Sequence, residues 1–294
     1  MSKHGPGRTA LVLAGGGSLG AVQVGMLQAL IEYGFEADLV VGASVGAING
    51  AYFAARPHRH GVEELADIWL SLRSKDVFPI HTFSAIKSLL LGQNHLVQAD
   101  ALAHLLERRL PVQHIEDTAL PLHIVATELL TGKENVLSTG PLIDALLASA
   151  AIPMIYPHRE IAGKALVDGS VASNTPIASA VALGAERLLV LPTGFGCACP
   201  AVPASMASLA LHTLNLLSMW QLVRDVEHYQ QQADIHVVAP LCPQAVSVFD
   251  FSVTAGLIRR ARLHTQRWIR EGGLTRTGVP DSLRPHHHGG EAGM

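Results

Sequence analysis

The stretch "VVGASVGAING", residues 40–50, decides how this chain is organised. A β-branched apolar run ends at Gly42, Ser44 lies between Gly42 and Gly46, and a run of small residues follows. In one explanation Ser44 is the N-cap of a tight strand-to-helix turn, because serine caps helices well and glycine tolerates unusual φ. In the other, Ser44 is the nucleophile of a strained elbow. Its neighbours two positions away must then be tiny, because the strand and helix backbones nearly touch.

A second glycine-rich turn precedes this stretch. The segment "AGGGSLG", residues 14–20, follows an apolar run and opens the next helical pattern. Successive glycines at the mouth of a helix expose backbone N–H groups, which attract an anion together with the helix dipole. The segment therefore suggests an oxyanion hole beside Ser44, a dinucleotide-binding turn, or a turn without a ligand. For the oxyanion hole, the candidate donors are Gly15, Gly16 and Gly17.

The dinucleotide explanation is the weaker one. Gly15, Gly17 and Gly20 match the G-x-G-x-x-G spacing literally. The second strand should then end in an acidic residue that binds the ribose. Here Asp38 begins that strand, and Gly42–Gly46 occupies its end.

Composition narrows the class of protein. Of 294 residues, 49% are hydrophobic and only 15% are charged, below the roughly 25% that is usual. This balance indicates a sheet buried on both faces. The net charge is −3 and no long basic run occurs, so we expect no nucleic-acid partner.

Short apolar runs alternate with longer helical patterns, which is typical of a parallel sheet. We therefore predict an α/β fold with a mainly parallel sheet covered by helices on both faces. The predicted strands are residues 9–17, 38–44, 122–129, 164–170, 187–193 and 234–240, and the first two predicted helices are 18–33 and 45–55.

The predicted domain organisation has three parts. Residues 1–8 form an N-terminal tail, and residues 9–271 form one α/β domain. Within it, residues 57–117 carry amphipathic helices, including "FSAIKSLLLG", and are expected to form a cap over the sheet edge. Residues 272–294 are rich in Gly, Pro and His, and are expected to be disordered.

The expected location is cytoplasmic, with peripheral contact to a membrane left open. Three cysteines make no disulfide framework. The apolar run near the N-terminus is too short for a signal peptide. Residues 201–223 are interrupted by polar side chains, so they suit a buried or membrane-contacting helix better than a span. The oligomeric state is left open.

Sixteen histidines leave a metal site conceivable, but no H-E-x-x-H or C-x-x-C pairing supports one. We expect neither a metal nor another cofactor.

A serine nucleophile needs a base, and two kinds of base are available. Asp168 in "ALVDGSVASNTP" ends an apolar strand and is followed by Gly169, so it would lie on the same edge of the sheet as Ser44. Its alternative role is to close the strand in an Asx turn. A histidine base, as in α/β-hydrolases, is the other possibility. The candidate histidines are His212, His228, His236 and His264. None of them lies in a local sequence motif that is typical of a catalytic histidine.

Three motifs in order, "AGGGSLG", "GASVG" and "VDGS", resemble the patatin-like phospholipase family over roughly residues 9–195. The block "ASAAIPMIYP", residues 148–157, and the positions of Asn174 and Pro176 add to the resemblance. It implies a Ser44–Asp168 dyad without a catalytic histidine, and an oxyanion hole at the glycines of "AGGGSLG". Gly20, Gly42, Gly46, Gly169 and Ser170 support the motifs.

Two positions depart from the family pattern. Leu19 stands where the family usually has a basic residue, and Ser170 stands where it usually has Gly or Ala. The resemblance implies hydrolysis of lipid acyl esters, as by a phospholipase A, a lysophospholipase or a general esterase. The alternatives are a histidine-based esterase and a lipid-binding or regulatory protein with little turnover.

Overall fold

The computed structural model describes residues 7–78, 95–194, 206–241 and 247–283. The segment "FSAIKSLLLG" lies outside these residues, so the helix predicted there is not tested. The three cysteines also lie outside the described residues.

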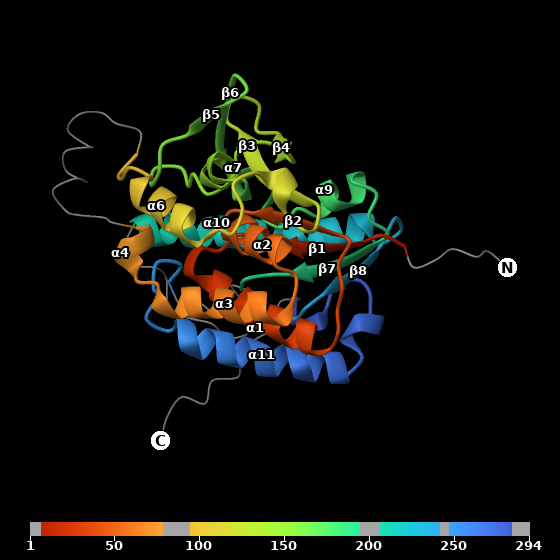
Figure 1. Ribbon diagram of the computed structural model, residues 1–294. Helices are drawn as coiled ribbons and strands as arrows, with labels where there is room; N and C mark the ends of the chain where they lie inside the picture. The colour runs from red at the N-terminus through yellow and green to blue at the C-terminus, as the bar shows by residue number, and fades with distance from the viewer. Residues whose placement is uncertain (1–6, 79–94, 195–205, 242–246, 284–294) are drawn as a thin grey trace.

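One eight-stranded sheet organises the fold, in the order β5-β6-β3-β2-β1-β7-β8 with β4 also paired to β3 (Figure 1). The strands are β1 (Thr9–Leu13), β2 (Leu39–Ala43), β3 (Leu122–Glu128), β4 (Glu134–Leu137), β5 (Arg159–Ile161), β6 (Lys164–Asp168), β7 (Arg187–Leu191) and β8 (Asp234–Val237). The run from β3 to β8 is parallel, as the continuous apolar strands predicted. The edge formed by β4, β5 and β6 is antiparallel.

The helices cover both faces of this sheet. They are α1 (Gly20–Glu32), α2 (Val45–Ala55), α3 (Arg59–Ser71), α4 (Ser74–Val77), α6 (Asp100–Arg109), α7 (Leu142–Ser149), α8 (Ser170–Ser173), α9 (Ile177–Ala182), α10 (Met206–Tyr229) and α11 (Thr254–Arg270). Short 3₁₀ turns lie at Gly17–Leu19, Ile115–Asp117, Gly273–Thr275 and Asp281–Leu283.

Alternate side chains along each central strand supply the two cores. On one face, Leu11 and Leu13 of β1 pack with helices α1, α2, α3 and α11. On the other, Ala10 and Val12 pack with α9 and α10. Burial on both faces explains why the strands are continuously apolar, and it confirms the predicted α/β architecture.

One predicted boundary changes in the structure. Helices α3 and α6 come from the segment expected to form a cap, and they pack in one core cluster with α1 and α2; the cap itself stays a prediction. The C-terminal segment does not lose order at residue 272. Leu283 is 1% exposed within the second core, and the Gly278 N–H donates to the Ile235 carbonyl at 2.9 Å. The buried Leu283 side chain and this backbone hydrogen bond both tie the segment to the core.

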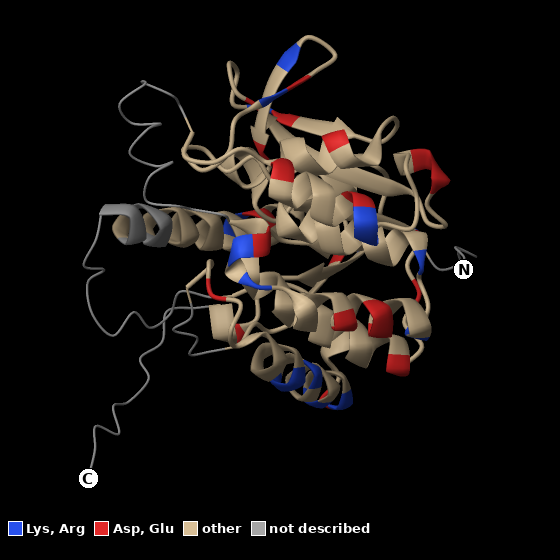
Figure 2. Cartoon of the chain, turned by 60° about the vertical axis from the view of Figure 1, so that its left-hand side comes forward, with Lys and Arg blue, Asp and Glu red and all other residues tan. Residues whose placement is uncertain are grey.

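Helix α10 projects past the body of the molecule (Figure 2). It precedes β8, whose direction is that of the parallel strands, so its N-terminal half lies toward their carboxyl ends. Over the residues that the structure describes, no helix is both long and apolar enough to cross a bilayer.

Candidate active site

Ser44 lies at a strained turn between β2 and α2. Its φ of 54° is in the left-handed region, which costs a non-glycine residue roughly 1–2 kcal/mol. A Cβ on Gly46 would overlap the Leu13 carbonyl oxygen, and one on Gly42 would lie 2.5 Å from the Gly46 oxygen. The strand and helix backbones therefore approach as closely as an elbow requires, and only glycine fits at either position.

The Ser44 hydroxyl donates a 2.7 Å hydrogen bond to Asp168 Oδ2. The other carboxylate oxygen accepts from the Ser170 N–H at 2.8 Å. Both side chains are buried, with Ser44 6% and Asp168 3% exposed. Burial raises the pKa of the Asp168 carboxyl, and the hydrogen bonds from Ser44 and Ser170 oppose that rise. The pair thus combines a hydroxyl with a carboxylate of increased basicity.

Asp168 reaches Ser44 by a different route from the one we predicted. We expected parallel strands to end at one edge, but β6 runs antiparallel to β3. The register aligns Asp168 with Ala126, while the next residue back, Val125, is aligned with Ala43. Asp168 therefore ends its strand at the level of Ser44.

Neighbouring hydroxyls hold both residues in place. Ser149 Oγ accepts from the Ser44 N–H at 2.9 Å and donates to the Val125 carbonyl at 2.6 Å. Thr127 Oγ1 donates to the Asp168 carbonyl at 2.8 Å. Sequence reasoning singled out neither residue for this role, although Ser149 belongs to the "ASAAIPMIYP" block.

The three candidate oxyanion glycines are not equivalent. The Gly15 N–H donates to the Asn174 carbonyl at 3.0 Å, so it is already engaged. Within the described residues, the N–H groups of Gly16 and Gly17 have no such partner. Gly16 has φ 157° and Gly17 has φ 57°. The oxyanion prediction therefore narrows to Gly16 and Gly17, and Gly15 instead permits close packing, since a Cβ there would lie 3.2 Å from Ser44 Cβ.

The N-terminus of the helical segment that follows these glycines is covered by another part of the chain. The Ser18 N–H donates to the Val248 carbonyl at 2.8 Å, and Ser18 Oγ donates to the Ser247 carbonyl at 3.0 Å. A dinucleotide pyrophosphate would need such N–H groups free. This contact and the engaged Gly15 N–H both argue against the dinucleotide explanation.

Leu19, the first departure from the family pattern, is partly buried and packs against the core. A Cβ on Gly194 would lie 3.3 Å from its Cδ1. Its apolar side chain therefore supports the loop by packing.

A buried polar network ties the glycine loop to two helices. Gln23 Nε2 donates to the carbonyls of Ala14 and Leu191, at 2.8 and 2.9 Å. Asn49 Nδ2 donates to Gln23 Oε1 at 2.9 Å, and Trp69 Nε1 donates to Asn49 Oδ1 at 2.8 Å. Every member has a partner, so the network fixes the ends of β1 and β7 relative to α1 and α2.

We expect Gln23→Leu to lower the free energy of unfolding by about 2–4 kcal/mol, because it leaves several buried polar groups unpaired at about 1–3 kcal/mol each. Urea unfolding measures the effect. Gln28→Leu on the same helix is the control, since Gln28 is only partly buried, and it should change stability by less than about 0.5 kcal/mol. Equal stability of the two variants would contradict a structural role for the network.

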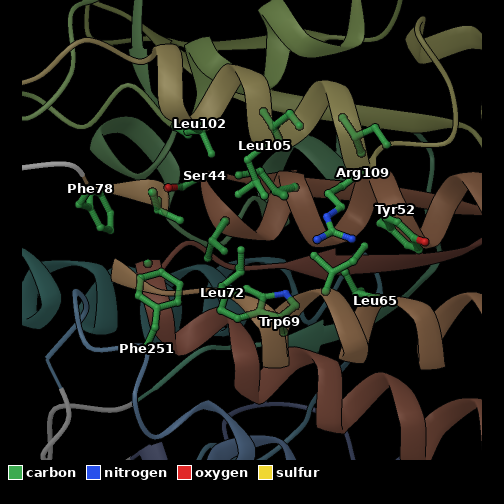
Figure 3. A pocket seen from close by; sticks show the side chains of 18 of the residues that line it. Ser44, Tyr52, Leu65, Trp69, Leu72, Phe78, Leu102, Leu105, Arg109 and Phe251 are labelled. Carbon is green, nitrogen blue, oxygen red and sulfur yellow. The ribbon is translucent and has the colours of Figure 1, made fainter. Parts of the chain in front are cut away.

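An apolar cavity opens beside Ser44, between α2, α3 and α6 (Figure 3). The room for the centres of water-sized molecules in it is about 80 Å³, and the space between its lining atoms is about 780 Å³ when the part open to solvent is counted. Its walls are mainly aliphatic and aromatic, and they include Val45, Ile48, Leu65, Trp69, Leu72, Phe78, Leu102, Leu105, Tyr156 and Phe251. Such a lining suits an acyl chain.

No described histidine forms a hydrogen bond with Ser44 or Asp168. His236 Nδ1 shares a hydrogen bond with the Arg276 carbonyl, and the His228 ring packs against Tyr229. Burial lowers the pKa of His264, which lines a separate pocket near Trp268. The side chain of His212 lies outside what the structure describes. The described part of the chain also contains no group of three or more potential metal-ligating side chains placed to share an ion.

The fold and this site define an α/β protein with a serine elbow hydrogen-bonded directly to an aspartate. The chain belongs to the patatin-like phospholipase family, whose model matches residues 11–181.

Curated relatives agree with this family. An uncharacterised NTE family protein of Mycobacterium bovis is 31% identical over 184 residues, which is 63% of this chain and 48% of that protein. Patatin-like phospholipase domain-containing protein 7 of Rattus norvegicus is 29% identical over 191 residues, which is 63% of this chain and 13% of that protein. The match thus spans about half of the first relative's length, and far less of the second.

A solved structure agrees with the fold. Human GIVD cytosolic phospholipase A2, in complex with a fluorophosphonate inhibitor, has a TM-score of 0.51 and 13% identity. That match covers 94% of this chain and 59% of the human chain. At this level of identity the likeness concerns the fold alone.

Proposed function

We propose that this protein hydrolyses acyl esters of lipids, with Ser44 as nucleophile and Asp168 as general base. The observation that carries the proposal is the 2.7 Å hydrogen bond between the two side chains inside a strained elbow. Membership of the patatin-like phospholipase family supports the substrate class. The proposed substrates are phospholipids or related acyl esters, and no cofactor enters the reaction.

The reaction would proceed in two halves. Ser44 Oγ attacks the ester carbonyl while its proton passes to Asp168, which then protonates the leaving alcohol. In this proposal the Gly16 and Gly17 N–H groups donate to the tetrahedral oxyanion, and the N-terminus of α2 would add its dipole. Asp168 next removes a proton from the water that attacks the acyl-enzyme. As the bond between the carbonyl carbon and Ser44 Oγ breaks, Asp168 returns that proton to Oγ and the carboxylic acid leaves.

The oxyanion assignment predicts a large effect of Gly16→Val. A Cβ at Gly16 would overlap Thr193 Oγ1, and the backbone there has a φ that favours glycine. We expect kcat for p-nitrophenyl esters to fall about 10²–10³-fold with a smaller change in KM, because the lost contact is strongest in the transition state. Labelling of Ser44 by a fluorophosphonate should slow in parallel.

Gly256→Val is the matched control. Gly256 lies on α11 with open space around it, so this variant should keep wild-type rates. A melting series with NAD, NADP and FAD tests the dinucleotide alternative in the same samples. Stabilisation by a nucleotide together with wild-type labelling of Gly16→Val would overturn the oxyanion assignment.

We also propose that α10 contacts the lipid surface. Between Met206 and Val223 the helix carries no Lys, Arg, Asp or Glu. Among the described side chains of this helix, the large exposed apolar ones are Leu209, Leu214, Leu217 and Trp220, between 46% and 58% exposed. Its N-terminal half lies toward the edge of the sheet that holds Ser44. A membrane bound there would therefore present its lipids near the active site.

This contact predicts weaker membrane binding for a Leu214→Gln/Leu217→Gln double variant. We expect about a tenfold or larger loss of affinity for phosphatidylcholine vesicles, because a buried Leu contributes about 1.5–3 kcal/mol. Vesicle co-sedimentation measures it. Leu263→Gln on α11, where Leu263 is 59% exposed, is the control and should bind as the wild type does. Equal losses in both variants would contradict a specific role for α10.

A further inference from the structure

Three helices build the cavity beside Ser44 as one channel. Its side chains recur at helical spacing, with Leu102, Leu105 and Arg109 on α6 facing Leu65 and Trp69 on α3. Figure 3 shows Ser44 and Phe78 at one end and Tyr52 and Arg109 at the other. The ester carbonyl would lie at the Ser44 end, so the channel leads the acyl chain toward Arg109.

The length of this channel follows from α2. Ser44 directly precedes that helix and Tyr52 lies near its end. At about 1.5 Å per residue, the two ends are about 12 Å apart. A fully extended peptide has three backbone bonds per residue and advances about 1.2 Å per bond. An extended acyl chain advances by about the same length per bond. A chain of about ten carbons therefore spans the channel and brings its last atoms beside Arg109.

Arg109 is an unusual residue to find there. Among the described residues that line the cavity, it carries the one charged side chain. Arg109 is exposed to solvent, and its guanidinium points into the channel in Figure 3. Across the part of the chain that the structure describes, no hydrogen bond or ion pair of Arg109 is found.

The acidic side chain at this end is already engaged. Glu64 pairs with Arg56, accepts a 3.2 Å hydrogen bond from the Tyr52 hydroxyl, and lies 3.5 Å from His60 Nε2. Burial and Glu64 raise the pKa of Tyr52, and the charges of Arg56 and, to a smaller extent, Arg109 oppose that rise. Arg109 is thus a solvent-exposed cation at the end of an apolar channel, with no hydrogen bond or ion pair to the described residues.

We propose that Arg109 is a specificity-determining residue that binds an anionic group at the far end of the acyl chain. The preferred substrates would be esters of medium-length acyl chains that end in a carboxylate. A carboxyl group can pass the apolar walls in its neutral form and ionise beside the guanidinium. This inference rests on the proposed ester hydrolysis at Ser44.

The test compares p-nitrophenyl esters in matched pairs. One pair is the decanedioate half-ester and the decanoate ester, which both reach Arg109. The other is the hexanedioate half-ester and the hexanoate ester, which are too short. We expect Arg109→Met to reduce the kcat/KM preference for the decanedioate half-ester about tenfold, relative to decanoate. The preference within the short pair should not change.

Arg108→Met is the matched control. Arg108 has the same charge in the same last turn of α6, so it makes the same contribution at the helix C-terminus, but it does not line the cavity. It should keep the wild-type preference. An equal loss in both variants, or an equal loss in both ester pairs, would overturn the proposal, because a general charge effect would then explain the result.

Binding separates this inference from the proposed function. Calorimetry measures the affinity of monomethyl decanedioate and methyl decanoate for Ser44→Ala, with and without Arg109→Met. We expect the decanedioate monoester to bind about tenfold more tightly only while Arg109 is present, even if turnover is absent. Hydrolysis of both long esters with no Arg109-dependent difference in rate or binding would refute the inference and leave the proposed function standing.

Discussion

The Ser44→Ala variant is expected to hydrolyse p-nitrophenyl esters about 10⁴-fold more slowly than the wild type, or slower still. Removing the hydroxyl removes the attacking atom, and in serine hydrolases such a loss can reach about 10⁶-fold in kcat. The fold should survive, since Ser44 Oγ makes its one side-chain hydrogen bond to Asp168 among the described residues. Steady-state kinetics and a thermal melt of the purified variant measure both effects.

Ser71→Ala is the control for this variant. Ser71 is exposed on α3 and its hydroxyl bonds only its own helix, so activity and melting temperature should stay at wild-type values. Turnover by Ser44→Ala within about tenfold of the wild type would remove Ser44 from the mechanism.

The Asp168→Asn variant is expected to lose about 10²–10⁴-fold in kcat, the usual contribution of a general base. The amide is nearly the same size, and its oxygen can still accept from the Ser170 N–H. It cannot take the Ser44 proton. The wild-type rate should fall as pH drops through the raised pKa of Asp168, because only the ionised form acts as a base. The residual rate of Asp168→Asn should lack that step.

The free energy of unfolding should respond to Asp168→Asn in the opposite sense from the catalytic rate. Burial raises the folded-state pKa of Asp168, so the folded state holds this proton more tightly than the unfolded state does. The resulting penalty is absent below the unfolded pKa and complete above the folded pKa. At neutral pH, Asp168→Asn should therefore be at least as stable as the wild type. A marked destabilisation of this variant, or wild-type activity in it, would argue against a buried general base.

The histidine alternative gives the opposite pattern. We expect individual substitution of His212, His228, His236 and His264 to leave activity within about tenfold, or about 1.4 kcal/mol of barrier. A histidine whose loss abolishes turnover in a folded protein would favour that alternative.

Most of the fold could be predicted because the central strands are buried on both faces. β1, β2, β3, β7 and β8 appear in the sequence as continuous apolar runs, and the structure confirms them. β4 and β5 were not predicted. They have 4 and 3 residues, and they are largely unburied, so no apolar run reveals them.

The candidate site could be predicted in part. Glycines beside Ser44 and after Asp168 are local signs of close backbone contact, and the structure brings these segments together. The direction of β6 could not be read from its residues, since strand pairing depends on distant partners. The same holds for Ser149 and Thr127, whose hydroxyls act through contacts far along the chain. The hydrogen bond of the Gly15 N–H also could not be predicted, because its acceptor, the Asn174 carbonyl, lies far along the chain.

The most direct test of the central claim is to identify the residue that an alkyl fluorophosphonate modifies. The reagent is added to the wild type, Ser44→Ala and Asp168→Asn, and the adduct is located by peptide mass spectrometry. We expect one adduct, on Ser44, that is absent from Ser44→Ala and forms far more slowly in Asp168→Asn. An adduct on another residue, or undiminished labelling of Ser44→Ala, would show that Ser44 is not the nucleophile.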